Sequence, residues 1–183
     1  MVKELLQQRI ANINFLIENK ENIELLYTIV LETILNNKKL LICGNGESSG
    51  IADNLAGLFV SKFKNLKNPI KAISLNSNTS LITSIANDTS FDDIFKKQIE
   101  NIGESGDTLI IFSASGTSRN IIEAIKQAKF QNIKTILITG NLKLNYSIDL
   151  EVNTFGEDFE QINEMHNIIA HIICELIGSN FNS

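Results

Sequence analysis

Two patterns of hydrophobic positions alternate along the chain. Short continuous apolar runs predict buried strands over 38–44, 70–75, 107–113 and 134–140, with a weaker one over 147–152. Apolar residues at helical spacing predict helices over 3–18, 22–37, 48–63, 79–86, 91–102, 118–129 and 158–177. Leu/Ile runs that alternate with helices are typical of a parallel sheet covered on both faces. We therefore expect an α/β fold, doubly wound, with a five-stranded parallel sheet and an N-terminal helical pair.

Composition places this fold in one domain. The chain has 183 residues, of which 43% are hydrophobic, and a single proline. With no Gly/Ser-rich linker or repeat, we expect one domain over 1–183, with N-terminal helices over 1–37 and a ligand-binding core over 38–178. The only cysteines, Cys43 and Cys174, fall inside a predicted strand and a predicted helix, where we expect buried thiols in a reducing, cytoplasmic compartment.

Charge and hydropathy narrow the classes of partner. The net charge is −5 and the lysines are scattered, so direct binding of nucleic acid is not expected. No window approaches the roughly 20 apolar residues of a membrane span, so no membrane partner is expected either.

Hydroxyl side chains gather where one predicted strand ends. In a doubly wound sheet, ligands bind outside the carboxyl ends of the strands, which here are followed by 44–49, 113–118 and the turn near 140. The segment 113–118 reads SASGTS and leads into a predicted helix. Hydroxyls, backbone N–H groups and a helix N-terminus at Ser113, Ser115 and Ser118 suit a phosphate, and Gly116 allows its close approach. The alternative is that Ser118 or Thr117 is only a helix N-cap.

A second loop of the same type follows the first strand. It reads GNGESSG over 44–50, with Asn45 between two glycines and Ser48 at the start of the next helix. Neither loop has the lysine of a Walker A motif, and GNGESS does not match GxGxxG. A single phosphate on a small molecule is therefore the predicted ligand.

Together these loops belong to a larger resemblance. It is carried by LLICGNGESSGIADNLAGLFVSKF, SLITSIANDTSFDDIFKKQI, GDTLIIFSASGTSRNIIEAI and QINEMHNIIAHIICELI, in that order, and runs from about residue 5 to 178. In this the chain resembles the sugar isomerase (SIS) domain family, and within it the phosphoheptose isomerases. The resemblance implies a homotetramer with active sites at subunit boundaries, which interconverts ketose and aldose forms of sedoheptulose 7-phosphate.

The binding residues that the resemblance implies are all present. The phosphate would be held by Ser48, Ser113, Ser115 and Ser118, and the sugar contacted by Asn45, Asn87 and Asp88.

The catalytic residues are mostly replaced. The family has a histidine and a glutamate where this chain has Asn54 and Leu58. On the C-terminal helix the family has a glutamine and a second histidine, at positions that are Asn163 and His171 here. Only His171 is retained as a predicted acid or base, and Asn163 is expected to contact substrate. Three or more ligands are usual for zinc, so no metal and no other cofactor is expected.

Two carboxylates are candidates to replace the missing base. Glu47 lies in the first loop, where the family usually has glycine, and the alternative is that it points to solvent. Glu164 lies seven residues before His171 on the same helix face, where it could orient the imidazole, and the alternative is a surface salt link or a solvated carboxylate. Proton transfer by a positioned acid and base contributes about 10²–10⁴-fold to such a reaction.

The sequence leaves the function open between an isomerase and a non-catalytic protein. The alternative is a DiaA-like regulator, which keeps the fold and tetramer and binds the replication initiator protein, or a phosphosugar sensor. The retained His171 favours the enzyme, and Leu58 favours the alternative.

Overall fold

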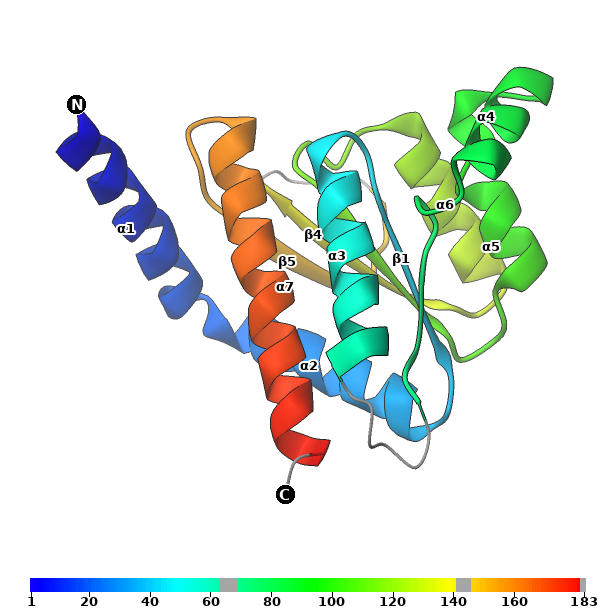
Figure 1. The fold of residues 1–183 in the computed structure, drawn as a ribbon, viewed down its shortest axis with the longest axis horizontal. Helices are drawn as coiled ribbons and strands as arrows, with labels where there is room; N and C mark the ends of the chain where they lie inside the picture. The colour runs from blue at the N-terminus through cyan, green and yellow to red at the C-terminus, as the bar shows by residue number, and fades with distance from the viewer. Residues whose placement is uncertain (63–68, 141–145, 182–183) are drawn as a thin grey trace.

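The computed structural model describes residues 1–62, 69–140 and 146–181 (Figure 1). Its elements, in chain order, are α1 (Val2–Glu18), α2 (Lys20–Leu35), β1 (Lys39–Gly44), α3 (Glu47–Lys62), β2 (Lys71–Ser74), α4 (Thr79–Asp88), the 3-10 helix η1 (Phe91–Asp93), α5 (Lys96–Ile102), β3 (Thr108–Ser113), α6 (Arg119–Phe130), β4 (Lys134–Gly140), β5 (Leu150–Thr154) and α7 (Phe159–Phe181). The predicted α/β class is confirmed.

The five strands form one parallel sheet in the order β2-β1-β3-β4-β5. The strand that follows β1 in the chain, β2, lies on one side of the β1–β3 pair, and the strand that follows β3, β4, lies on the opposite side. The carboxyl ends of β1 and β3 are therefore the topological switch point, where sheets of this kind form their ligand crevice. Gly44, the last residue of β1, pairs with Phe112 of β3, so the loops 44–47 and 113–118 leave the sheet side by side.

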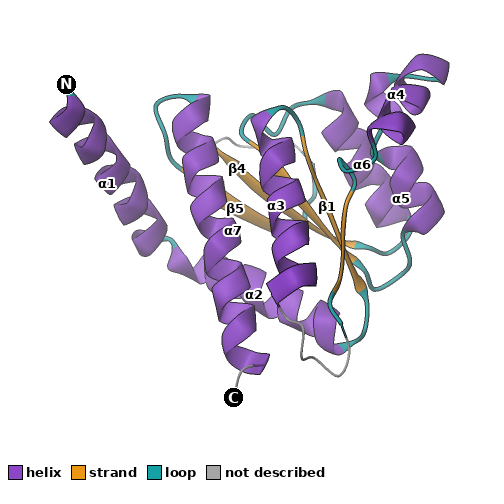
Figure 2. Cartoon of the chain, viewed as in Figure 1, coloured by secondary structure: helices purple, strands orange, loops and turns teal. Residues whose placement is uncertain are grey.

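Helices cover both faces of the sheet, as continuous apolar strands require (Figure 2). Successive residues of β3 point to opposite faces: Ile110 and Phe112 pack with α2, α3 and α7, whereas Leu109 and Ile111 pack with α4, α5 and α6. Cys43 and Cys174 are buried free thiols, as predicted.

One predicted helix is divided. The expected helix over 91–102 is interrupted between η1 and α5. The hydroxyl of Ser90 accepts a hydrogen bond from the backbone N–H of Asp92 and so starts a separate short turn.

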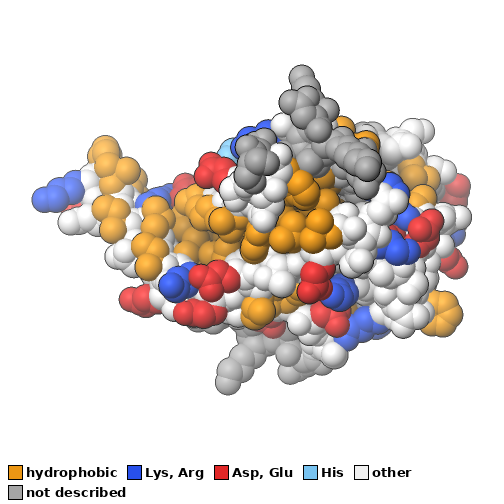
Figure 3. All heavy atoms as spheres, turned by 90° about the horizontal axis from the view of Figure 1, so that it is seen from below, with side chains coloured by type: hydrophobic (Ala, Val, Ile, Leu, Met, Phe, Trp, Pro, Cys, Tyr) orange, Lys and Arg blue, Asp and Glu red, His pale blue; other side chains and the backbone are white. Residues whose placement is uncertain are grey.

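The two N-terminal helices pack differently against the rest of the fold. α2 packs under the sheet through Leu26 and Val30. α1 instead projects from the body and contacts it along α7 and β5 (Figure 1). Figure 3 shows hydrophobic side chains exposed on this projection and on the face beside it. Those of α1 are Leu5, Leu6, Ile10, Ile13 and Ile17. Among the described residues, the helices are too short or too polar to cross a membrane.

The core contains a buried imidazole. His166 of α7 is fully buried, and its ring centroid lies 5.9 Å from that of Phe112. Neither ring nitrogen has a hydrogen-bond partner of good geometry among the described residues. Burial lowers the pKa of His166 to about 4, and the backbone of Thr139 offsets this only in part.

This imidazole makes stability depend on pH. Because the folded pKa lies below the ordinary 6.5, the unfolded chain binds the proton more tightly, and stability falls as pH drops from about 6.5 to 4. The shift predicts a loss of about 3 kcal/mol from this group over that window. We expect His166→Leu to remove most of this pH-dependent loss of stability, measured by urea unfolding of both proteins at pH 7 and pH 4. An equal loss in both proteins would contradict the assignment.

Candidate functional site

The predicted phosphate-binding residues meet in one pocket. We call it the serine pocket; it has a volume of about 200 Å³ and lies at the carboxyl ends of β1 and β3, closed on a third side by the start of α7. It is lined by Asn45, Ser48, Ser113, Ala114, Ser115, Ser118, Phe159 and Asn163.

The loop 113–118 holds its hydroxyls toward this pocket without using them all for capping. Gly116 has φ +63°, a left-handed conformation that favours glycine, and its backbone N–H donates to Ser113 Oγ at 3.1 Å. Ser118 occupies the N-cap position of α6, but its hydroxyl makes no capping hydrogen bond. The hydroxyl of Ser118 is therefore not used to cap α6.

The first loop is built in the same way. Gly46 has φ +54° and lets the chain turn directly from β1 into α3. Gly44 permits a close approach, because a Cβ there would lie 2.6 Å from the carbonyl oxygen of Ser48. Asn45 exchanges two amide hydrogen bonds with Asn120 of α6, at 2.9 and 2.8 Å, and so ties the two loops together.

The serine pocket offers a ligand hydroxyl groups and helix dipoles. Among the described residues, its lining contains no charged side chain. The helices α3 and α6 both begin at its edge, and helix N-termini carry partial positive charge and unpaired N–H groups.

A second pocket adjoins the serine pocket. This polar pocket has a volume of about 270 Å³ and is lined by Glu47, Gly50, Ile51, Asn54, Asn163, Glu164 and Asn167. Asn163 lines both pockets. Its Oδ1 accepts from the Ser48 hydroxyl at 2.8 Å, and its Nδ2 donates to Glu47 Oε2 at 3.2 Å. A continuous hydrogen-bond chain thus runs from the serine pocket to the Glu47 carboxylate.

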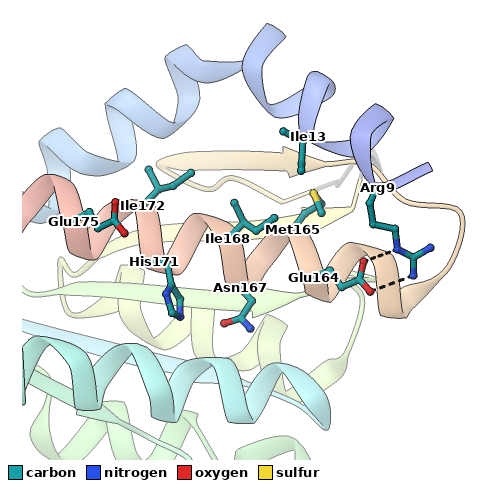
Figure 4. Close-up of a pocket in the computed structure, with 9 residues that line it drawn as sticks. All are labelled: Arg9, Ile13, Glu164, Met165, Asn167, Ile168, His171, Ile172 and Glu175. Carbon is teal, nitrogen blue, oxygen red and sulfur yellow. Dashed lines mark hydrogen bonds and ion pairs between the residues drawn. The ribbon is translucent and has the colours of Figure 1, made fainter. Parts of the chain in front are cut away.

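The other two predicted acid–base residues, Glu164 and His171, have different hydrogen-bond partners. Glu164 accepts two hydrogen bonds from the Arg9 guanidinium, at 2.9 and 3.1 Å, rather than pairing with His171 (Figure 4). His171 is exposed on α7 and points toward α3, where its Nε2 lies 3.4 Å from Asn54 Nδ2. Glu164 therefore forms a salt link, one of the two alternatives for this carboxylate, because α1 packs against the start of α7 and supplies Arg9.

Two predicted sugar-binding residues lie elsewhere in the chain. Asn87 and Asp88 are exposed at the end of α4 and line neither pocket. They are bonded to each other, Asn87 Nδ2 donating to Asp88 Oδ1 at 2.9 Å. The turn after residue 140, also expected near the site, falls largely outside the described residues.

The positions of the family's catalytic histidine and glutamate do not fit a metal here. Leu58 has no donor atom and packs against the core, and Asn54 Nδ2 lies 3.4 Å from Nε2 of His171. Within the described part of the chain, no three His, Cys, Asp or Glu side chains are placed to hold a metal ion.

Sequence reasoning missed an aromatic residue of the serine pocket. Phe159, the first residue of α7, lines the serine pocket and is 61% exposed. The sequence signal that could have identified it is an aromatic residue in the first turn of the helix that follows β5, a strand of the same sheet.

Comparisons with known proteins agree on one family. The SIS domain matches residues 7–140. The phosphoheptose isomerase of Campylobacter concisus is 36% identical over 162 residues, covering 87% of this chain and 86% of that protein. That of Aliarcobacter butzleri is 36% identical over 184 residues, covering 98% and 96%.

Solved structures give the same result. Phosphoheptose isomerase GmhA from Neisseria gonorrhoeae superposes with a TM-score of 0.83 at 30% identity, covering 97% of this chain and 95% of that one. A phosphoheptose isomerase from Francisella tularensis has a TM-score of 0.84 at 29% identity, covering 97% and 94%. The chain therefore belongs to the SIS domain family, in the branch of the phosphoheptose isomerases.

Proposed function

We propose that the chain binds a sugar phosphate, with the phosphate in the serine pocket and the sugar hydroxyls along the polar pocket. One observation carries the proposal: the hydroxyls of Ser113, Ser115 and Ser118 and the N-termini of α3 and α6 converge on a single small pocket. The relationship to phosphoheptose isomerases supports a heptose phosphate as the ligand class.

The chemistry of the serine pocket favours an anion of this size. A phosphate accepts many hydrogen bonds, and hydroxyl groups and helix N-termini supply the donors here. Among the described residues of the pocket, no Lys or Arg side chain has to lose its hydration to bind it. Ser118 supports this function because its hydroxyl is not spent on the helix.

The polar pocket favours the uncharged end of the ligand. The amides of Asn54, Asn163 and Asn167 both donate and accept hydrogen bonds, as sugar hydroxyls do. The Glu47 carboxylate contacts only a neutral amide, so its charge disfavours the phosphate end of the ligand in this pocket.

A thermal-shift titration tests the proposal. We expect sedoheptulose 7-phosphate to stabilise the protein, by about 2.7 kcal/mol when its concentration is 100 times Kd. Unphosphorylated sedoheptulose should give a much smaller shift at the same concentration, and inorganic phosphate an intermediate one. Equal shifts from the phosphorylated and unphosphorylated sugars, or no shift from either, would contradict the phosphate site.

We also propose a homotetramer. The exposed apolar residues of α1, and a groove of about 540 Å³ between α1 and α7 lined in part by Ile13, Ile168 and Ile172, support burial of this face against other copies of the chain (Figures 3 and 4). Light scattering on the purified chain tests the mass, and a monomer would contradict it.

The alternative function is a non-catalytic one, as a phosphosugar sensor or a regulator that binds the replication initiator. Leu58, half-buried against the core where the family has glutamate, supports it. The enzyme and the phosphosugar sensor differ in turnover, not in sugar-phosphate binding.

A further inference from the structure

The two carboxylates of the polar pocket differ in what they contact. Both oxygens of Glu164 accept hydrogen bonds from the Arg9 guanidinium. Glu47 has one contact with a neutral amide, from Asn163 to Oε2, and its Oε1 has no hydrogen-bond partner among the described residues. Glu47 is thus the carboxylate of this pocket with an oxygen free to accept a proton from a ligand.

Glu47 is also placed by rigid parts of the fold. It is the first residue of α3 and directly precedes Ser48, which lines the serine pocket. Asn163 is buried, and it holds Ser48 through Oδ1 and Glu47 through Nδ2. A ligand anchored by its phosphate in the serine pocket and extending past Asn163 brings its uncharged end into the pocket that Glu47 lines.

We infer that Glu47 is a catalytic base of this protein, which moves a hydrogen between C1 and C2 of the bound sugar phosphate, with Asn163 as its positioning residue. The inference rests on the proposed function, because it requires the phosphate in the serine pocket. It makes the chain an aldose–ketose isomerase whose base is the first residue of α3, directly before Ser48 of the serine pocket.

The step balances without an oxidant or a metal. Glu47 removes the proton from C1 of the ketose, the electron pair of that C–H bond forms the C1=C2 double bond, and the C2 carbonyl oxygen gains a proton from water. The C1 hydroxyl then returns a proton to water as the C1=O bond forms, and Glu47 delivers its proton to C2. The product is the aldose, and Glu47 is again a carboxylate.

The test compares turnover and binding in matched variants of the full chain. We expect the wild-type protein to convert sedoheptulose 7-phosphate to its aldose isomer, and NMR in D₂O to show deuterium entering C2 of the product. Glu47→Gln should lower this rate by 100-fold or more, within the range for loss of a general base, and change the Kd for the sugar phosphate by less than about threefold. Glu47→Asp, which keeps the carboxylate, should retain more turnover than Glu47→Gln.

The control is Glu100→Gln, the same chemical change at an exposed position of α5 outside both pockets. Its turnover should match the wild type. Wild-type protein that binds the sugar phosphate without turning it over would overturn the role of Glu47 and leave the proposed function standing. Undiminished turnover in Glu47→Gln would also overturn it. Absence of sugar-phosphate binding by the wild type would remove the proposed function and this inference together.

Discussion

Replacing Ser118 with aspartate is expected to abolish sugar-phosphate binding and leave the fold intact. Aspartate is as good an N-cap as serine, so α6 should remain stable. Its carboxylate would face the phosphate across the serine pocket, where unit charges about 5 Å apart repel by about 3 kcal/mol at an effective dielectric constant of 20. We expect Kd to rise by more than 100-fold, measured by isothermal titration with sedoheptulose 7-phosphate.

The matched control is Ser118→Asn. Asparagine has nearly the shape of aspartate and is also a good N-cap, but it is neutral. It should weaken binding by far less than aspartate does. If the two variants bound equally, steric change rather than charge would be responsible, and the phosphate would not lie beside Ser118.

Gly44→Ala, a single change at the edge of the serine pocket, is expected to destabilise the protein. The added Cβ would lie 2.6 Å from the carbonyl oxygen of Ser48 and 2.8 Å from its carbonyl carbon. These are backbone atoms of the first turn of α3, so the helix must shift rather than a flexible side chain. Overpacking of this kind costs about 1–3 kcal/mol, measured by urea unfolding, and the shift should also weaken sugar-phosphate binding.

Gly57→Ala is the control for this change. Gly57 lies inside α3, and a Cβ there would meet no heavy atom within 4 Å. Alanine in a helix interior is about 0.5–1 kcal/mol more favourable than glycine, so this variant should be more stable than the wild type. A destabilised Gly57→Ala, or an unaffected Gly44→Ala, would contradict the packing of α3 described above.

The sequence predicted the sheet and both loops of the serine pocket because their signals are local. Apolar runs such as 107–113 identify a buried strand without reference to the rest of the chain. The rule that ligands bind at the carboxyl ends of strands then brought Ser113 and Ser48 to one crevice. Element ends were less exact: β5 begins at Leu150, three residues after the expected 147.

The contacts that the sequence did not predict depend on tertiary packing. The partner of Glu164 is Arg9, 155 residues away, and nothing in the helix that carries Glu164 indicates where α1 lies. Similarly, helical spacing places Glu164 and His171 on one face of the helix but does not show whether they interact, and the fold directs His171 toward Asn54 of α3. Asn87 and Asp88 share a segment with family-like residues, yet α4 carries them outside both pockets of the single chain.

The most direct test of the phosphate site is a crystal structure of the protein with sedoheptulose 7-phosphate. We expect the phosphate within hydrogen-bond distance of the hydroxyls of Ser113, Ser115 and Ser118, and the sugar hydroxyls beside Asn163 and Glu47. A phosphate bound at any other place in the chain, with the serine pocket free of it, would contradict the proposed site.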